Sequence, residues 1–490
     1  MSSIRYLSSS DVRIGFRPGV SAVPRADDRV EVQGPLGGVA LAGMTPGVRE
    51  AIRMLDEPGS DEWTLENAVR RVDGDGALPV LHFCLQRLDA VGALSRTLVV
   101  DERPLATVEP VAASPGFLEH APSPDVRYVL SRFAYLRRDS TRLVLETPLA
   151  RCRLVLHDWR GAAIIARFAF GATPSGLVDE LPGISEEAAV ATGRLLLGLA
   201  ALTEVDEDGR TTEEADPALC SWEAHDLLFH TRSRRGRHDR PYGGTYRLAG
   251  SLPPSPAVKP PPPRVQGLDL YRPDLDRLAA LDSTLTTVIE RRSSVRVHGP
   301  EPITALQLGE FLYRVARLRH LEETEHGQLA FYPYPSGGAS SELTLYAVID
   351  RCEGVADGIH QYAPDEHVLY PVCGRTAGVE LLLREAAAAM KVPAVPQVLI
   401  VVAARFQRVS RKYESMAYAL ILKHVGVLYQ QMYLVATAMG LAACGIGGGD
   451  SDAFAAAVGT RYYEETSVGE FALGSSATTS SGDAPMSRPD

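Results

Sequence analysis

The sequence predicts a protein of helices and strands in which two small winged-helix-like modules precede one larger domain. Three observations favour this: a strand–helix pattern that occurs twice in the first half, a proline-rich stretch, and a long apolar strand and helix near the end. A chain of 490 residues suits about three domains. We expect the modules over 1–105 and 125–215, a connecting segment over 216–267, the larger domain over 268–476 and a disordered tail over 477–490.

Composition excludes several classes of protein. The formal net charge of −11 argues against a general attraction to nucleic acid or to anionic membranes. The six cysteines are dispersed and form no C-x-x-C pair, which indicates a reduced protein without a disulfide framework or structural zinc. The opening MSSIRYLSSSDVRIGF lacks a secretory core, and no apolar run is long enough to span a bilayer. We therefore expect a soluble cytoplasmic protein without a metal site.

The first module is predicted from residues 30–100. The segment EVQGPLGGVALAG has short alternating strands with glycine turns. Thr45-Pro46 opens one helix, Thr64-Leu65-Glu66 a second, and PVLHFCLQRLDAVGAL forms a third. The strand LSRTLVV follows and completes a winged-helix-like order.

The second module repeats this pattern weakly over 142–205. The strands of RLVLETPLARCRLVLHD precede a Thr-Pro helix start, Ser185-Glu186-Glu187 begins a final helix, and LTEV forms a last strand. Neither candidate recognition helix is densely basic, which disfavours DNA binding. Capture of a peptide as an added strand at a sheet edge is the favoured use.

The connecting segment begins with WEAHDLLFHTRSRRGRHDRPYGGTYR, which is rich in arginine and histidine. It is either a solvated basic loop or, as its aromatic residues and Gly243-Gly244 favour, an ordered segment. No cysteine or carboxylate spacing completes a metal site around its histidines. The following SLPPSPAVKPPPPR predicts an extended, polyproline-like linker, and we expect the main domain boundary there.

A phosphate-binding segment is predicted at the start of the larger domain. In RRSSVR, alternation places Arg292, Ser294 and Arg296 on one side of an extended chain. Two planar guanidiniums and a hydroxyl suit a phosphate. The alternative is that the arginines satisfy the carbonyls at the end of the preceding helix.

Two glycine turns allow a ligand to approach the backbone closely. The first is Gly337-Gly338, within YPYPSGGAS, and the second lies in CGIGGG, which starts at Cys444. Each turn also has a simpler interpretation as a tight connection.

The strand PQVLIVVAARF is apolar throughout, which predicts a central buried strand, and HQYAPDEHVLYPV predicts a hairpin. The strand delivers Arg405 and Arg408 toward a Lys412-Tyr413 pair. A helix follows over about 416–439, apolar on all sides and capped by Gly440, so we expect it in a large core or a subunit interface.

Together, RRSSVR, YPSGG, RFQRVSRKY, GVLYQQMYLVATAMGL and CGIGGG carry a family resemblance. Residues from about 278 to 475 resemble the nitroreductase-like flavoproteins. Within them they look like the SagB/McbC-type dehydrogenases, the azoline oxidases of ribosomal peptide natural-product biosynthesis, for which the Lys-Tyr pair is the more specific mark. The arginine-rich connecting segment resembles the one that precedes the oxidase domain in long members, which carry winged-helix peptide-clamp units.

The resemblance implies an α+β fold, with a mixed sheet flanked by helices, in a homodimer that holds FMN at the subunit interface. It implies that Lys412 and Tyr413 are catalytic. The sequence departs from the family pattern at Val295 and His298, where many members have other residues. The C-terminal tail also lacks the basic phosphate ligand of simple nitroreductases, which leaves the roles of Arg405 and Arg408 open. The implied FMN-binding residues are Arg292, Ser293, Ser294 and Arg296 at the phosphate, and Pro335, Ser336, Gly337, Gly338, Gly445, Ile446, Gly447 and Gly448 at the ring system.

The implied reaction is the FMN-dependent oxidation of thiazolines or oxazolines to thiazoles or oxazoles in a precursor peptide, with a cyclodehydratase as a further partner. FMN takes a hydride and the protein must supply a base. A lysine serves as base only when its pKa is lowered, for example by nearby cations, and Arg405, Arg408 and Arg411 are close in sequence. Whether Lys412 or Tyr413 is the base stays open. The alternatives are a peptide-binding scaffold without catalysis and a general nitro or flavin reductase.

Overall fold

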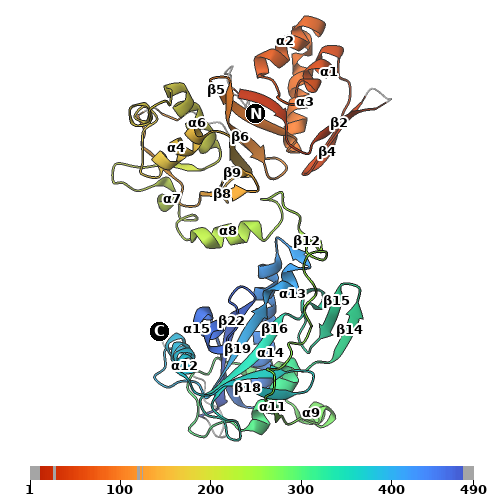
Figure 1. The fold of residues 1–490 in the computed structure, drawn as a ribbon, viewed down its shortest axis with the longest axis vertical. Coiled ribbons are helices and arrows are strands. Elements are labelled where there is room, and N and C mark those ends of the chain that lie inside the picture. The colour runs from red at the N-terminus through yellow and green to blue at the C-terminus, as the bar shows by residue number, and fades with distance from the viewer. Residues whose placement is uncertain (1–11, 26–28, 118–121, 124, 478–490) are drawn as a thin grey trace. The chain divides into compact units, whose positions relative to one another are not determined.

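The computed structural model describes residues 12–25, 29–117, 122–123 and 125–477. The chain forms two units, residues 1–240 and 241–490 (Figure 1). All but the first residue of the tail predicted over 477–490 lies outside the described residues.

A six-stranded antiparallel sheet runs through the N-terminal unit. Three of its strands belong to the first predicted module and three to the second. Val108 pairs with Leu154, and this ladder joins the two halves into one sheet. The strand order is β1 (Val12–Phe16), β5 (Leu94–Val100), β6 (Arg103–Pro110), β10 (Cys152–Leu156), β9 (Arg142–Glu146) and β8 (Tyr135–Asp139).

Helices pack on this sheet in two separate hydrophobic cores, one with the helices of the first module and one with those of the second. The second core also includes Val12 and Leu98 from strands of the first module. The second helix of the first module begins earlier than predicted, because Asp61 and not Thr64 caps it by accepting a bond from the Thr64 N–H. The first module contains β2 (Ser21–Pro24), β3 (Val30–Gly34), β4 (Gly37–Leu41), α1 (Pro46–Arg53), α2 (Glu62–Asp73) and α3 (Leu78–Ala90).

The second module includes a helix that we did not predict, α4 (Trp159–Phe168), which begins at an Asp158 cap. The helix expected at the Thr-Pro pair begins later, at Leu177, because Thr173 forms a turn by accepting a bond from the Gly176 N–H. The remaining elements are β7 (Tyr128–Leu130), α5 (Leu177–Glu180), α6 (Glu186–Gly198), β11 (Leu202–Glu204), α7 (Thr212–Ala215) and α8 (Ala224–Arg232).

The C-terminal unit is built on a seven-stranded sheet with the predicted strand β19 (Val398–Arg405) in its interior, between β16 and β22. Every described ladder in this sheet is antiparallel, so the prediction of a mixed sheet is wrong. Hairpins that reverse the chain join β16, β17 and β18, which confirms the predicted hairpin. The order is β13 (Leu268–Asp269), β18 (Val368–Cys373), β17 (Gly358–Ala363), β16 (Leu343–Ile349), β19, β22 (Glu465–Ser475) and β21 (Leu441–Ile446).

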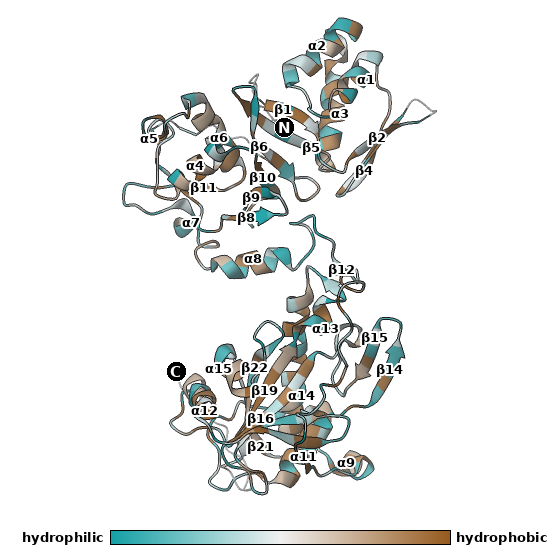
Figure 2. Ribbon diagram, in the orientation of Figure 1, coloured by the Kyte–Doolittle hydropathy of each residue, from teal (hydrophilic) through white to brown (hydrophobic). Residues whose placement is uncertain are grey.

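Helices pack on both faces of the seven-stranded sheet, whose strands are largely apolar (Figure 2). Alternate residues of β19 point to opposite faces: Ile400 and Val402 belong to one core, and Leu399 and Val401 to the other. On the first face lie α11 (Ala305–Ala316) and α14 (Ala417–Ala438), and on the second lie α12 (Ala377–Met390) and α15 (Ser451–Val458). Shorter elements are α9 (Leu275–Leu281), α10 (Leu285–Arg291), β14 (His320–Thr324), β15 (Gly327–Phe331) and α13 (Phe406–Ser410).

The proline-rich segment belongs to the C-terminal unit. Arg405 donates to the carbonyls of Pro256 (2.6 Å) and Ala257 (2.5 Å), and Lys259 Nζ bonds to Glu465 (2.5 Å). These bonds fix the segment against β19 and β22. The division between the units therefore falls between residues 240 and 241, ahead of the linker in which we expected the main boundary.

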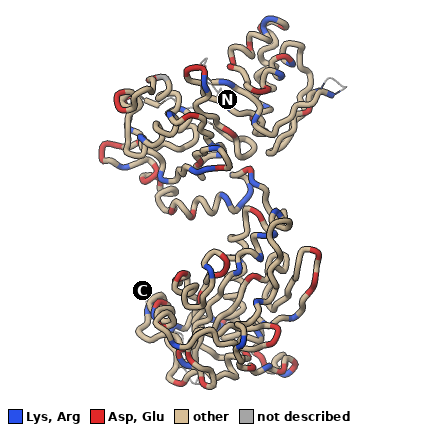
Figure 3. The backbone as a smooth tube through the Cα atoms, viewed as in Figure 1, with Lys and Arg blue, Asp and Glu red and all other residues tan. Residues whose placement is uncertain are grey.

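Charged residues of both signs are spread over both units (Figure 3). Among the described residues, no helix combines the length and the apolar character that crossing a membrane requires.

Candidate active site

The long helix α14 supports the predicted motifs of the C-terminal unit. Its buried face, with Ile421, Leu428 and Met432, packs into the core beneath the sheet. Gly440 follows it with φ +70° and donates to the Thr437 carbonyl, which ends the helix as predicted. Two groups of site residues lie along this helix: one surrounds Tyr433 and the other surrounds His424.

The first group, which we call the phosphate-side cluster, joins RRSSVR to CGIGGG through Tyr433. The Tyr433 hydroxyl lies 2.8 Å from Ser294 Oγ and accepts the Gly445 N–H at 2.7 Å. The guanidinium of Arg292 lies 5.2 Å from the centre of the Tyr433 ring. Sequence reasoning missed Tyr433, because an aromatic residue on an apolar helix looks like a core residue.

The guanidiniums of this cluster are not neutralised by the protein. Arg292 is half-buried and Arg296 is exposed, and neither side chain forms an ion pair or hydrogen bond with the described residues. The interpretation that they satisfy the end of α10 therefore finds no support in the described contacts. Two free guanidiniums beside the Ser294 hydroxyl form a donor set for an anion.

The glycines of CGIGGG differ in the space around them. A Cβ placed on Gly447 or Gly448 meets no atom within 4 Å, so their backbone is open to a ligand. A Cβ on Gly449 would instead collide with the Glu470 carboxyl group. The first two glycines leave room for a binding partner, whereas a side chain at the third would require the Glu470 carboxyl group to move.

The second group, which we call the ring-side cluster, brings Gly338 against the Lys412-Tyr413 pair. Lys412 Nζ donates to the Gly338 carbonyl at 3.2 Å. Gly338 has φ +58°, and a Cβ there would collide with Lys412 Nζ and the Tyr413 hydroxyl. A side chain at this position would force Lys412 and Tyr413 to move and would strain the backbone, so glycine is favoured.

A buried His–Glu pair supports the same turn, and sequence reasoning missed it. The Gly337 N–H donates to His424 Nε2 at 2.7 Å, so Nδ1 carries the proton and donates to Glu342 Oε1 at 2.7 Å. Glu342 is fully buried, and no described group bonds its second oxygen. The sequence did contain a sign of this pair: His424 lies on the apolar face of α14, and a buried polar side chain needs a hydrogen-bond partner.

The three arginines near Lys412 are engaged with the main chain. Arg408 donates to the carbonyls of Ser340 (2.8 Å) and Ser255 (2.7 Å), and Arg411 to that of Leu252 (2.7 Å). Burial lowers the pKa of Arg408 to about 10, and Arg405 adds to the shift. Arg405 and Arg408 therefore hold the segment that contains Ser255, Pro256 and Ala257 in place, and their guanidiniums donate to main-chain carbonyls.

The two clusters occupy different parts of α14. His424 and Tyr433 are nine residues apart in the sequence, which corresponds to about 14 Å along a helix. One chain thus presents an anion-binding group and a lysine–tyrosine group at separate positions.

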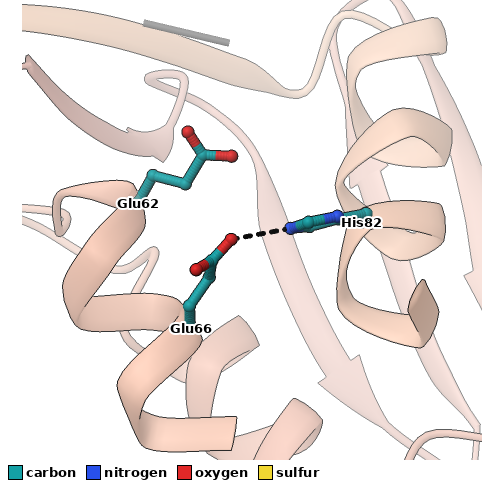
Figure 4. A group of neighbouring side chains, drawn as sticks. All are labelled: Glu62, Glu66 and His82. Atoms are coloured by element: carbon teal, nitrogen blue, oxygen red, sulfur yellow. Dashed lines mark hydrogen bonds and ion pairs between the residues drawn. The ribbon is translucent and has the colours of Figure 1, made fainter. Parts of the chain in front are cut away.

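In the N-terminal unit, Glu62, Glu66 and His82 place ligand atoms within 4.8 Å of one another (Figure 4). Among the described residues this is the one group with metal-ligand spacing. Arg70 already pairs with Glu66 at 2.6 Å, and burial followed by repulsion from Glu66 raises the pKa of Glu62. These contacts account for the group as a local charge network.

Comparisons with known families match both halves of the chain. The model described as "Cyanobactin oxidase ThcOx" matches residues 128–239, and that of the nitroreductase family matches residues 289–475. A Methanocaldococcus jannaschii protein named as a nitroreductase is 27% identical over 180 residues, which are 37% of this chain and 84% of that protein.

Solved structures with a related fold have low sequence identity. One from Anabaena variabilis, named as a nitroreductase, is 18% identical with a TM-score of 0.36; the match covers 50% of this chain and 45% of that one. The Escherichia coli microcin synthetase McbBCD complex, solved with truncated pro-MccB17, is 18% identical with a TM-score of 0.33, covering 51% and 91%. A Desulfovibrio desulfuricans structure in complex with FMN is 15% identical with a TM-score of 0.26, covering 42% and 94%. By the family models, the C-terminal residues 289–475 match the nitroreductase family, and the preceding residues 128–239 match cyanobactin oxidase.

Proposed function

We propose that this protein is an FMN-dependent dehydrogenase that oxidises thiazoline or oxazoline rings to thiazoles or oxazoles in a ribosomally synthesised peptide. The observation that carries the proposal is the contact of the Lys412-Tyr413 pair with Gly338, where an added Cβ would collide with both side chains. The pair is the specific mark of the azoline oxidases that this chain resembles. The matches to the cyanobactin oxidase and nitroreductase models support the same reaction class.

The phosphate-side cluster fits the phosphate of FMN. Arg292 and Arg296 lack carboxylate partners in the described structure, and Ser294 adds a hydroxyl. Ser293, exposed between them, offers another hydroxyl. The open backbone of Gly447 and Gly448 suits the approach of a flat ring system, with Gly445 and Ile446 beside it. FMN, when bound there, supplies the two-electron acceptor that the oxidation needs.

Conversion of an azoline to an azole removes two hydrogens from adjacent ring carbons. One leaves as a proton and the other as a hydride. Lys412 or Tyr413 takes the proton, because both side chains border the turn over 335–338 at which the ring system of FMN is proposed to lie. The His424–Glu342 pair holds the Gly337 amide and so keeps that turn, with Pro335 and Ser336, in place. A base held in position contributes about 10²–10⁴-fold to such a step.

We propose that the active protein is a homodimer. Apolar side chains on α14 and α10 are exposed in the single chain, among them Leu422 (40%) and Leu285 (66%). A helix that is apolar on all sides but buried on one face favours a subunit interface. A two-fold axis near α14 would bring the ring-side cluster of one protomer toward the phosphate-side cluster of the other.

The N-terminal unit is proposed to capture the azoline-containing precursor peptide. Strand β8 is the last in the order of the six-stranded sheet, so its outer edge suits an added peptide strand. The match to the cyanobactin oxidase model spans this strand. A cyclodehydratase that makes the azoline is the proposed partner.

Two measurements test the function. The purified protein should show flavin absorbance bands, and it should convert an azoline peptide with a loss of about 2 Da per ring, the mass of two hydrogens. Flavin without azoline conversion, together with rapid reduction of nitroaromatics, would favour the general reductase to which the nitroreductase match also points. Absence of flavin would favour a peptide-binding scaffold.

A further inference from the structure

The chain that enters the C-terminal unit passes directly over the Lys412-Tyr413 pair. We call residues 241–259 the strap. Its strand β12 (Gly243–Gly244) pairs with β20 (Tyr413–Glu414), with Gly244 opposite Tyr413. Thr245 Oγ1 also donates to Glu414 at 2.9 Å. The strap and the Lys-Tyr segment are therefore one hydrogen-bonded structure.

One side chain of the strap, Tyr246, lies against Lys412. Its N–H donates to the Lys412 carbonyl at 3.1 Å, and its backbone has φ +54°, which is uncommon for a residue with a side chain. The centre of its ring is 5.6 Å from Lys412 Nζ. The other neighbour of the ring is His326, at 4.1 Å between ring centres and 31° between planes.

The Lys412 ammonium is held by aromatic rings and a carbonyl. Tyr246 lies on one side, Tyr413 has its ring centre 5.4 Å away, and the Gly338 carbonyl accepts a bond at 3.2 Å. Among the described residues no carboxylate lies within ion-pair distance of Lys412. Cations within about 6 Å of an aromatic ring are attracted to it. The position of the ammonium therefore depends on Tyr246.

A cavity of about 190 Å³ opens beside this group. A cavity of this size has room for a small ring. Tyr246 and His326 give it an aromatic wall, and Lys412 lies at its border. Its lining includes Tyr246, Pro254, His326, Gly338, Arg411 and Lys412.

We propose that Tyr246 is the positioning residue for Lys412, and that Tyr246 and His326 form the wall on which the five-membered azoline ring of the peptide stacks. The ring-stacking part rests on the proposed function. A flat five-membered ring suits the size of the cavity and its aromatic wall. The first residues of the C-terminal unit thus supply part of the proposed active site.

Chemical labelling tests the positioning role without any catalytic assay. The lysines of the chain are Lys259, Lys391, Lys412 and Lys423, so site-resolved acetylation by mass spectrometry can follow each one. Tyr246→Leu should raise the labelling rate of Lys412 several-fold relative to the exposed Lys391. Tyr246→Phe keeps the ring and should stay within twofold of wild type. Equal Lys412 labelling in wild type and Tyr246→Leu would overturn the positioning role.

Kinetics test the ring-stacking role. At equal FMN content, Tyr246→Leu should lower kcat for azoline oxidation by about tenfold or more and alter its pH profile, since a misplaced group can cost up to about 10²-fold. Tyr246→Phe should keep the wild-type kcat and pH profile, and His326→Ala should mainly raise KM. Tyr463→Leu, at a tyrosine that is 86% exposed, is the matched control.

The outcomes separate the two proposals. Azoline conversion by wild type with unchanged kinetics in Tyr246→Leu and His326→Ala would overturn the stacking role and leave the proposed function standing. No azoline conversion by wild type would remove the function and the stacking role together, and the labelling result would still decide the positioning role. If Tyr246→Leu does not fold, His326→Ala removes the other ring and leaves the backbone bonds of Tyr246 intact.

Discussion

The ring-side and phosphate-side clusters differ in how many of their polar and charged groups have partners within the protein. In the ring-side cluster, Lys412 bonds to Gly338 and His424 bonds to both Gly337 and Glu342. In the phosphate-side cluster, Arg292 and Arg296 have no ionic partner among the described residues. The ring-side cluster is therefore already organised by contacts within the protein, whereas the phosphate-side cluster has positive charge available for an anion. A substitution should therefore impair catalysis in the first cluster and FMN retention in the second.

The largest expected effect is at Lys412 and Tyr413. Lys412→Ala and Tyr413→Phe should each keep FMN, and the variant that removes the true base should lose about 10²–10⁴-fold in azoline oxidation. The measurement is the rate of mass loss in an azoline peptide, with flavin absorbance recorded on the same samples. Lys391→Ala, at an exposed lysine on the end of α12, is the control. Apoprotein from either variant would mean that the pair is structural.

Gly338→Ala should have the next largest effect. The added methyl group collides with Lys412 Nζ and the Tyr413 hydroxyl, and the residue has φ +58°. Displacement of the base should lower kcat by up to about 10²-fold. Gly374→Ala is a matched control, because nothing lies within 4 Å of a Cβ there. Wild-type kinetics in Gly338→Ala would show that the pair acts elsewhere.

Loss of a guanidinium in the phosphate-side cluster should weaken FMN binding and leave the chemistry of the remaining loaded protein intact. Each charge-assisted bond contributes about 1.5–3 kcal/mol, so Arg292→Ala or Arg296→Ala should raise the FMN Kd by about 10- to 150-fold. Fluorescence titration of apoprotein with FMN measures this. Arg291→Ala is the control, because Arg291 is exposed at the end of α10 and lies outside the alternating set of Arg292, Ser294 and Arg296. Its FMN affinity should stay close to that of wild type. Equal affinities in all three variants would contradict the phosphate assignment.

Acid pH should lower the free energy of unfolding through His298, which follows the RRSSVR segment of the phosphate-side cluster. His298 Nδ1 accepts the Gln397 N–H at 3.2 Å, and burial, followed by Arg351, lowers the pKa of His298 to about 4. Between pH 6.5 and about 4 the unfolded state binds the proton and the folded state does not, so the free energy of unfolding falls as pH falls.

This loss should amount to about 2 kcal/mol by pH 5. Urea unfolding at pH 7 and pH 5 measures it. His298→Asn keeps an acceptor for Gln397 and should show a shallower pH dependence. An identical dependence in wild type and variant would exclude His298 as the source.

The sequence predicted the framework of the C-terminal unit because local patterns determine it. The apolar run of β19, the period of α14 and the glycine that ends it are all visible within short windows. The ring-side partners were not predictable in this way. His424 and Glu342 are 82 residues apart, and their contact depends on how α14 packs beneath β16.

The arginines next to Lys412 show the same limit more sharply. Proximity in sequence predicted that Arg405, Arg408 and Arg411 surround the lysine. In the structure their guanidiniums bond to main-chain carbonyls about 65 to 160 residues away. A guanidinium has five N–H donors, and sequence does not indicate whether phosphate, carboxylate or main chain will accept them.

These arginine bonds have a practical consequence for how the protein can be divided. A fragment that begins near residue 268, the domain start suggested by composition, would lack Leu252, Ser255 and Pro256 and would leave several guanidinium N–H groups without acceptors. It would also lack Tyr246, which touches Lys412. A shortened form of the proposed oxidase should therefore begin no later than Pro241. A protease that cuts within the proline-rich stretch should abolish the proposed activity without removing any residue of the segment that matches the nitroreductase family.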